Sequence, residues 1–326
     1  MMMLSNIFVL LDASAISFCH YETSGCASTI MALETLRTMV KYAHEKRVSL
    51  TFLLGEKPLP QEYHELIEEV SGIKIGPPSV ACGPFDISVI GLSSATPVNL
   101  FDKPISSNVI VRVDKDGLGH LHEVIDGLNG KVSRLTIILS KLDTYTDEEL
   151  ATYKEMLMVL VPRVGRIHAA GLTTEINVLT DRSMLEKMNN CNAGITHFTV
   201  APNGLAYICP GFYYEDIGPV LGSIGDGWEI PNRNLLALES APICRCCDAF
   251  QCKRCVFLNI KSTGEVNTPS RQQCIAAHTE REASMNLLES ETRNGGCLSA
   301  YAGSVQPVGY IDPLDALERN RDTEQV

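Results

Sequence analysis

Short apolar runs alternate with amphipathic segments over the first two-thirds of this 326-residue chain, and this alternation limits the folds open to it. The apolar runs have the length and the β-branched content of buried strands. They cover residues 7–11, 48–54, 86–90, 109–113, 135–139 and 175–179. Strands joined in succession by helices form a parallel sheet with right-handed crossovers. The sequence therefore predicts an α/β fold, as either a partial (β/α) barrel or an open doubly wound sheet.

Helices are expected between these strands. Residues 28–47 carry a long amphipathic pattern, and a shorter helix is expected after Pro60. A further helix begins at Thr146, where Glu149 three residues later completes a capping box. Pro162 is expected to help end that helix, because proline removes a backbone donor and clashes with the preceding turn.

The character of the chain changes near residue 189. Helical periodicity fades, and Gly, Pro and Cys interrupt short segments, of which 197–200 and 205–208 read as the two strands of a hairpin. We expect an α/β domain over 1–189, a cysteine-rich domain over 190–290 and a C-terminal extension over 291–326.

Seven cysteines of this second region fall at spacings typical of metal sites. They are Cys191, Cys209, Cys244, Cys247, Cys252, Cys255 and Cys274. Thiolates two to five residues apart on turns can converge on one metal centre, and distant cysteines then complete its coordination. No export signal is recognisable at the start of the chain, so we expect a cytoplasmic protein. In that reducing compartment, clustered cysteines more often bind metal than form disulfides.

Charge and hydropathy exclude some classes of partner. The net charge is −12 and the sequence pI is about 5.2, which disfavours nucleic acid and anionic membranes as partners. No apolar run reaches the 18 residues that a membrane-spanning helix needs. We therefore expect neither a nucleic-acid nor a membrane partner.

The cysteine spacing resembles the SPASM domain, the cysteine-rich extension of many radical S-adenosylmethionine peptide-modifying enzymes. That pattern opens with a cysteine, nine to fifteen residues, a glycine, four residues and a second cysteine, which Cys191, Gly204 and Cys209 satisfy. It continues as C-x2-C-x5-C-x3-C and a distant cysteine. Here the run from Cys244 to Cys255 is C-x2-C-x4-C-x2-C, so two of its spacings are each one residue short.

The resemblance implies two cluster sites. One [4Fe–4S] cluster would be held by Cys244, Cys247, Cys252 and Cys274, and the other by Cys191, Cys209 and Cys255. For the fourth ligand of the second site, Cys246 is the first candidate and an open iron position is the alternative. Four thiolates with zinc would instead give a closed structural site, and spacing does not choose between the metals.

The catalytic motif of the resembled enzymes, C-x3-C-x2-C after the first strand, is absent. The corresponding loop holds Cys19, His20 and Cys26, which cannot supply three thiolates facing one cluster. We interpret Cys19 as a small hydrophobic residue without a metal role. Gly55 and Glu56 after the second strand partly match a family sequence that binds the cofactor's amino group. They read either as a turn at the end of the strand or as the remnant of that cofactor site. Binding of S-adenosylmethionine is not expected.

The segment 18–21, Phe-Cys-His-Tyr, together with the cysteine-rich region, makes the chain similar to CXXX repeat peptide maturases. These are SPASM-containing relatives of radical S-adenosylmethionine enzymes. The resemblance implies a partial (β/α) barrel followed by a SPASM-like iron–sulfur domain. It also implies a role in maturing a ribosomally made, cysteine-rich peptide. In the first hypothesis the protein is an iron–sulfur enzyme subunit that relays electrons. In the second it is a non-catalytic protein that presents the precursor to a radical enzyme. A zinc-stabilised interaction protein is a third hypothesis.

Overall fold

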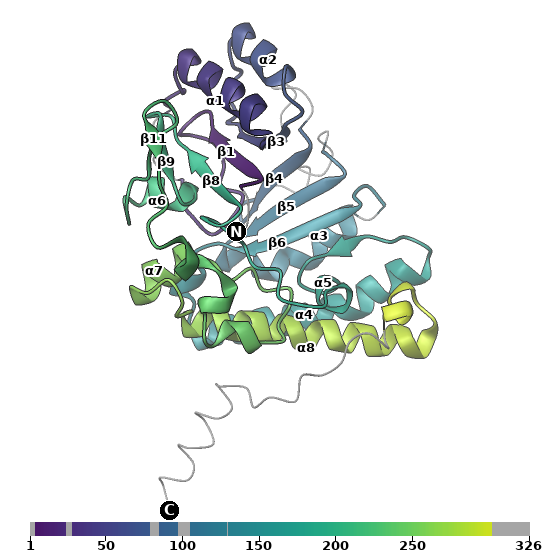
Figure 1. The fold of residues 1–326 in the computed structure, drawn as a ribbon. Helices are drawn as coiled ribbons and strands as arrows, with labels where there is room; N and C mark the ends of the chain where they lie inside the picture. The colour runs from purple at the N-terminus through teal and green to yellow at the C-terminus, as the bar shows by residue number, and fades with distance from the viewer. Residues whose placement is uncertain (1–3, 24–27, 79–84, 97–104, 129, 302–326) are drawn as a thin grey trace, which may run out of the picture.

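One sheet of eleven strands runs through the residues that the computed structural model describes, which are 4–23, 28–78, 85–96, 105–128 and 130–301 (Figure 1). Its order is β11-β10-β9-β8-β1-β2-β3-β4-β5-β6-β7. The strands are β1 Asn6–Leu10, β2 Ser49–Leu53, β3 Ile73–Gly76, β4 Ile87–Leu92, β5 Asn108–Val113, β6 Arg134–Leu139, β7 Glu175–Ile176, β8 His197–Val200, β9 Leu205–Tyr207, β10 Gly222–Ser223 and β11 Gly227–Trp228. Neighbours from β8 through β1 to β7 are parallel, whereas β8 to β11 are antiparallel.

This strand order is that of a barrel opened between β7 and β8. Strands β1 to β7 follow one another in chain order, and the chain then returns so that β8 pairs with β1. A doubly wound sheet reverses its order at a switch point in the middle. Of the two arrangements that the sequence left open, the order agrees with the partial barrel. The predicted hairpin is confirmed as β8 and β9.

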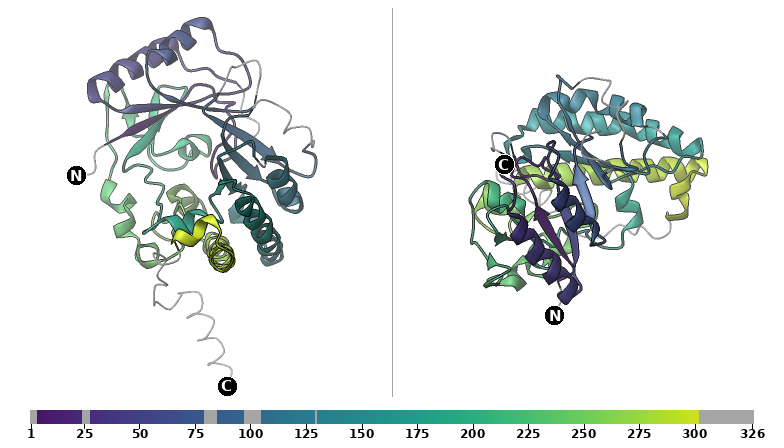
Figure 2. Two further views of the ribbon diagram at one scale, coloured as in Figure 1. Left: turned by 90° about the vertical axis from the view of Figure 1, so that its right-hand side faces the viewer. Right: turned by 90° about the horizontal axis from the view of Figure 1, so that it is seen from above.

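Helices lie on both sides of the sheet (Figure 2). They are α1 Leu33–Lys46, α2 Gln61–Glu68, α3 Leu121–Leu128, α4 Asp147–Ala169, α5 Asp181–Met184, α6 Pro210–Tyr214, α7 Val256–Thr263 and α8 Arg271–Asn294. The first four helices cover the outer face of the sheet, whereas α6 and α7 contribute Pro210 and Phe257 to the inner face. Strand β6 shows how the two faces differ: Leu135, Ile137 and Leu139 pack in the core with α3 and α4. The alternate residues Arg134, Thr136 and Ile138 point to the inner face and line a cavity. No helix among the described residues has the length and apolar character needed to span a bilayer.

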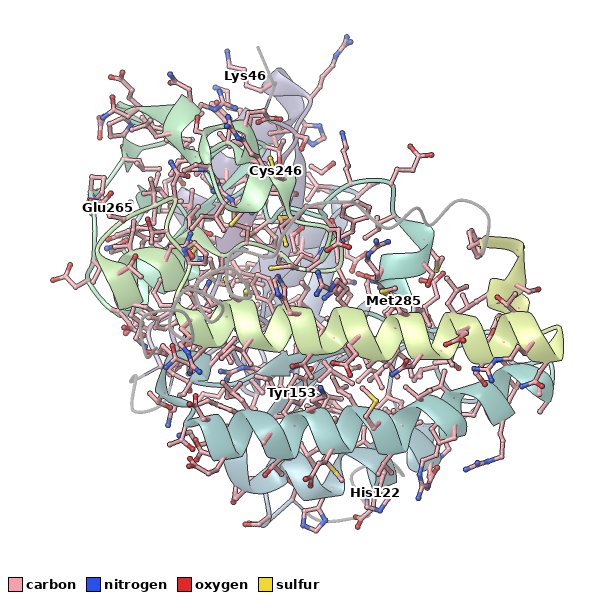
Figure 3. The ribbon with its side chains drawn as sticks, turned by 90° about the horizontal axis from the view of Figure 1, so that it is seen from below. Lys46, His122, Tyr153, Cys246, Glu265 and Met285 are labelled. Carbon is pink, nitrogen blue, oxygen red and sulfur yellow. The ribbon has the colours of Figure 1, made fainter. Side chains whose placement is uncertain are left out.

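Helix α8 is the largest departure from the sequence prediction, which expected no long helix after residue 189. It runs for 24 residues and begins with a capping box between Ser270 and Gln273. Its contacts with α4 follow the same order along both helices, so the two run parallel (Figure 3). The pattern escaped detection because α8 buries a narrow face composed largely of Ala and Leu between polar residues.

Two helix boundaries also differ from the prediction. Helix α4 has the predicted capping box between Thr146 and Glu149, but it continues through Pro162 to Ala169. Burial of Val164 and Ile167 beyond the proline offsets the missing hydrogen bond. Helix α1 begins at Leu33, because residues before it bridge to the loop after β1.

A carboxyl group lies partly buried between α4, α8 and the cysteine-rich segment. The Glu280 carboxylate accepts hydrogen bonds from Tyr153 Oη at 2.9 Å and from Gln251 Nε2 at 3.3 Å. Burial raises the pKa of Glu280 from 4.5 to about 7, although both hydrogen bonds oppose this shift. The folded protein therefore favours a neutral group at this position.

Replacing Glu280 with Gln should change how stability depends on pH. Because the folded pKa is raised, the stability that the neutral carboxyl provides is complete below pH 4.5 and is lost as the pH rises through about 7. The free energy of unfolding of the variant minus that of the wild type should be larger at pH 8 than at pH 4. The increase should be on the order of 2 kcal/mol. Urea unfolding of both proteins at the same metal content measures this. Parallel pH profiles would contradict it.

Candidate metal centre

A cavity of about 380 Å³ lies on the inner face of the opened barrel, between the strands and the cysteine-rich segment. Strands β1, β5 and β6 supply Phe8, Ile110 and Thr136 to its wall. Four cysteines from distant parts of the chain also line it: Cys19, Cys191, Cys209 and Cys255. A cavity of this size falls in the range that holds a small ligand or cofactor.

Backbone pairing brings three of the predicted ligands to this cavity. The Cys191 N–H donates to Lys253 O at 2.7 Å, which places Cys191 next to the segment that ends in Cys255. Cys209 follows β9, after the hairpin turns at Gly204 with a φ of +79°, a value that suits glycine. The three cysteines that the resemblance assigned to one cluster therefore line the same cavity.

The fourth cysteine, Cys19, arrives from the loop after β1, and the sequence analysis gave it no metal role. Its thiol is hydrogen-bonded to that of Cys255. Arg112 of β5 holds the loop, donating from Nε to Cys19 O at 3.2 Å and from Nη2 to Tyr21 O at 3.1 Å. Glu22 pairs with Arg112 Nη2 at 2.6 Å. No spacing rule links Cys19 to the later cysteines, so only the three-dimensional fold reveals this neighbour.

Burial makes most of these thiols reluctant to ionise. It raises the pKa of Cys191 to about 11 and that of Cys209 further. The Cys255 pKa is raised by its hydrogen bond to Cys19 and then by burial. The same hydrogen bond lowers the pKa of Cys19 to about 5, helped by the positive charge of Arg112. One thiolate can form here unaided, whereas four thiolates need compensating positive charge of the kind a metal supplies.

Several predicted ligands accept a hydrogen bond from the amide two residues later. The pairs are Cys191 with Ala193, Cys209 with Gly211, Cys247 with Ala249 at 3.4 Å, and Cys252 with Arg254 at 3.4 Å. An N–H that points at sulfur stabilises the thiolate form. Hydrogen bonds to sulfur also tune iron–sulfur clusters. The local backbone at these cysteines is thus suited to hold metal-bound thiolates.

A second group of thiols lies outside the barrel. Cys244, Cys247 and Cys252 pack in one small apolar cluster with Met188 and Ala241. His278 of α8 faces this group, with its Nε2 3.6 Å from Cys247 Sγ. Cys274 lies in the first turn of α8, four residues before His278, and therefore on the same face of the helix.

The remaining predicted site residues do not line the cavity. Cys246 is exposed and is not among the residues that line the cavity (Figure 3). Gly55 is buried beneath the loop after β1, where an added Cβ would lie 3.1 Å from Ser14 Oγ. Glu56 is exposed, and neither residue lines the cavity. Cys26 lies outside the described residues.

Buried cations accompany the thiols. Arg254 is 2% exposed, lies between the two groups and interacts electrostatically with cysteines of both. Arg182 is 1% exposed, and its charge acts on Cys247. Its Nε and Nη1 have no hydrogen-bond partner among the described residues. Because buried polar groups normally have partners, these donors fit an anionic group such as a thiolate-ligated cluster. Of the other basic residues, Lys253 lines the cavity and Arg271 pairs with Asp147.

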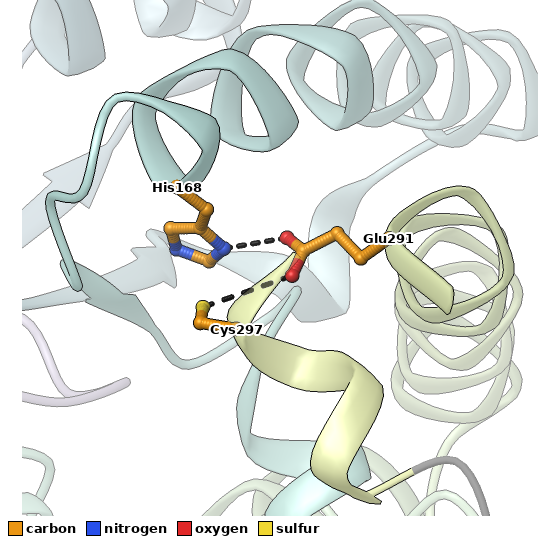
Figure 4. A group of neighbouring side chains, drawn as sticks. All are labelled: His168, Glu291 and Cys297. Atoms are coloured by element: carbon orange, nitrogen blue, oxygen red, sulfur yellow. Dashed lines mark hydrogen bonds and ion pairs between the residues drawn. The ribbon is translucent and has the colours of Figure 1, made fainter. Parts of the chain in front are cut away.

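A different set of metal-binding residue types meets at the far end of α8 (Figure 4). In the described part of the chain, the one group of three such donor atoms within 4.8 Å of one another is His168, Glu291 and Cys297. His168 Nδ1 lies 2.5 Å from Glu291 Oε1, and Glu291 Oε2 accepts from the Leu298 N–H at 2.9 Å. These contacts join α4, α8 and the 3-10 helix Cys297–Tyr301, which indicates a structural role.

Comparisons with known proteins show the fold. No family model matches the chain, and no curated protein matches it. Among solved structures, it is similar to SuiB of Streptococcus suis in a crystal structure bound to the precursor peptide SuiA. The TM-score is 0.52 at 12% identity, over 84% of this chain and 76% of SuiB. This chain therefore shares with SuiB a mixed α/β fold built on a large parallel sheet.

Proposed function

We propose that this protein acts in the maturation of a ribosomally made, cysteine-rich peptide, and that it carries two [4Fe–4S] clusters. The observation that carries the proposal is the cavity lined by Cys19, Cys191, Cys209 and Cys255 on the inner face of the barrel. The fold shared with SuiB, which was crystallised with a precursor peptide, supports a peptide as the partner. The peptide of this protein would carry Cys-x-x-x repeats, as the sequence resemblance implies.

The chain's own residues would bind and orient the peptide around this centre. A bound [4Fe–4S] cluster supplies one-electron transfer or a rigid link between segments. The aromatic side chains of Phe8, Phe18 and Phe257 form an apolar wall for a peptide side chain. Lys253 lines the same cavity, where its charge balances thiolates or receives an acidic group. Arg134, also on the wall, is paired with Glu175 and Asp181.

A second function is a non-catalytic, zinc- or cluster-stabilised protein that binds the peptide for a separate radical enzyme. The contact between Cys247 Sγ and His278 Nε2 favours it, because three cysteines and a histidine form a common structural zinc set. The absence of C-x3-C-x2-C also favours it, and S-adenosylmethionine is not part of either proposal. Metal content separates the two functions.

Metal and sulfide content is the first test of the proposal. Protein purified without oxygen should contain about eight irons and about eight sulfides per chain. Replacing Cys252 with Ala should remove about four irons and lower the stability of the surrounding segment, because metal binding there is coupled to folding. The matched control replaces the exposed Cys297 with Ala and should retain all the iron. Zinc without sulfide in the wild type would favour the second function.

Peptide binding is the second test. A fluorescent synthetic peptide with several Cys-x-x-x repeats should bind the metal-loaded protein saturably, as measured by anisotropy. Replacing Phe18 with Ala removes part of the apolar wall and should weaken binding by about tenfold, which corresponds to about 1.4 kcal/mol. His122→Ala, in α3 and away from the residues that line the cavity, is the matched control and should bind like the wild type (Figure 3). Equal affinity of all three proteins would argue against the cavity as the peptide site.

A further inference from the structure

We infer that Cys19 is the fourth thiolate ligand of the cluster held by Cys191, Cys209 and Cys255. The site is then closed by four protein ligands, one of them from the N-terminal loop. This inference deepens the proposed function, because it rests on a metal centre in the same cavity. It also assigns a role to the loop after β1, which lacks the motif that a catalytic cluster needs.

The position of the Cys19 thiol is the first argument. All four cysteines line one cavity, and the Cys19 thiol is close enough to that of Cys255 for a hydrogen bond. Cys246, the ligand expected from sequence, is exposed on the 3-10 helix Cys244–Cys246 and does not line the cavity. Of these two thiols, Cys19 is the one inside the site.

The way in which the loop is fixed is the second argument. Arg112 binds the carbonyl groups of Cys19 and Tyr21, so both residues are held from β5 across the barrel. Phe18 stacks on Phe8 of β1 with ring centroids 5.2 Å apart, and Tyr21 stacks on Tyr214 at 5.3 Å. Side-chain packing on both sides of Cys19 therefore leaves its thiol little freedom to leave the cavity.

The chemistry of the loop suits a ligand better than a packing residue. Cys19 is only partly buried, whereas a cysteine that acts as a small hydrophobe is usually fully buried. Binding requires each of the four thiols to lose its proton as its sulfur–iron bond forms, and the protons leave to solvent. Arg112 and Lys253 provide positive charge close to the thiolates that result.

The proposal has a consequence for the peptide. A cluster with four protein thiolates has no open iron, so a peptide thiolate cannot bind to it without displacing a cysteine. The peptide then lies against the remaining wall of the cavity. The cluster connects the loop after β1 to the segments before β8, after β9 and before α7.

Paired substitutions test this assignment. Cys19→Ala and Cys246→Ala should be purified without oxygen, checked for folding by circular dichroism, and compared with the wild type for iron, sulfide and electron paramagnetic resonance spectra. Cys19→Ala should lose between about one and about four irons, or show a three-iron signal after mild oxidation. Cys246→Ala should match the wild type. Adding 2-mercaptoethanol to Cys19→Gly should restore the four-iron signal, because the small thiol replaces the missing ligand.

A folding defect is distinguished by Cys19→Ser, which keeps the size of the side chain. It should bind both clusters but shift the spectrum or reduction potential of one of them. Unchanged spectra and iron content in the Cys19 variants would overturn the inference, as would iron loss in Cys246→Ala alone. If the wild type holds zinc without sulfide, the iron–sulfur function fails separately. The ligand assignment then stands or falls on whether Cys19→Ala loses zinc.

Discussion

The parallel pairing of β8 with β1 is the constraint on which the rest of the structure depends. It brings the chain back from the far edge of the sheet and aligns His197 with Asn6, so that the cysteine-rich region begins beside the first strand. Without this pairing, Cys191 and Cys209 would have no fixed relation to the barrel interior. The antiparallel strands β9 to β11 then extend the same sheet, so the start of the cysteine-rich region and the barrel share one hydrogen-bonded framework.

Charge balance explains how the protein can hold ionisable thiols and a carboxyl group in its interior. Burial raises the pKa of Cys252, and the nearby Glu280 carboxyl adds to this shift. Against these groups stand Arg254 and Arg182, whose own pKa values burial lowers. Buried charges of one sign are costly unless others compensate them. The buried cations therefore offset part of the cost of placing ionisable thiols and a carboxyl group inside the protein.

The alternation of strands and helices was accessible from the sequence because it depends on periodicity, whereas the strand order was left open between two arrangements. The grouping of Cys191, Cys209 and Cys255 came from the family resemblance. The position of Cys19 was not accessible, since it depends on Arg112 reaching across from β5. Helix α8 was missed because its buried face is narrow, and Pro162 was misjudged because packing outweighed a local rule. In each case a contact between distant segments decided the outcome, and a local pattern carries no information about such contacts.

The cavity is walled by segments from opposite parts of the chain, with Phe18 near its beginning and Phe257 far towards its end. A ribosome delivers these segments one after the other, and domains generally fold as units during synthesis. The inner wall of the barrel therefore remains incomplete until the segment that precedes α7 has emerged. During that interval the loop after β1 is exposed with its thiol uncovered. The Cys19 side of the cavity is therefore made early and enclosed late, by residues more than two hundred positions further along the chain.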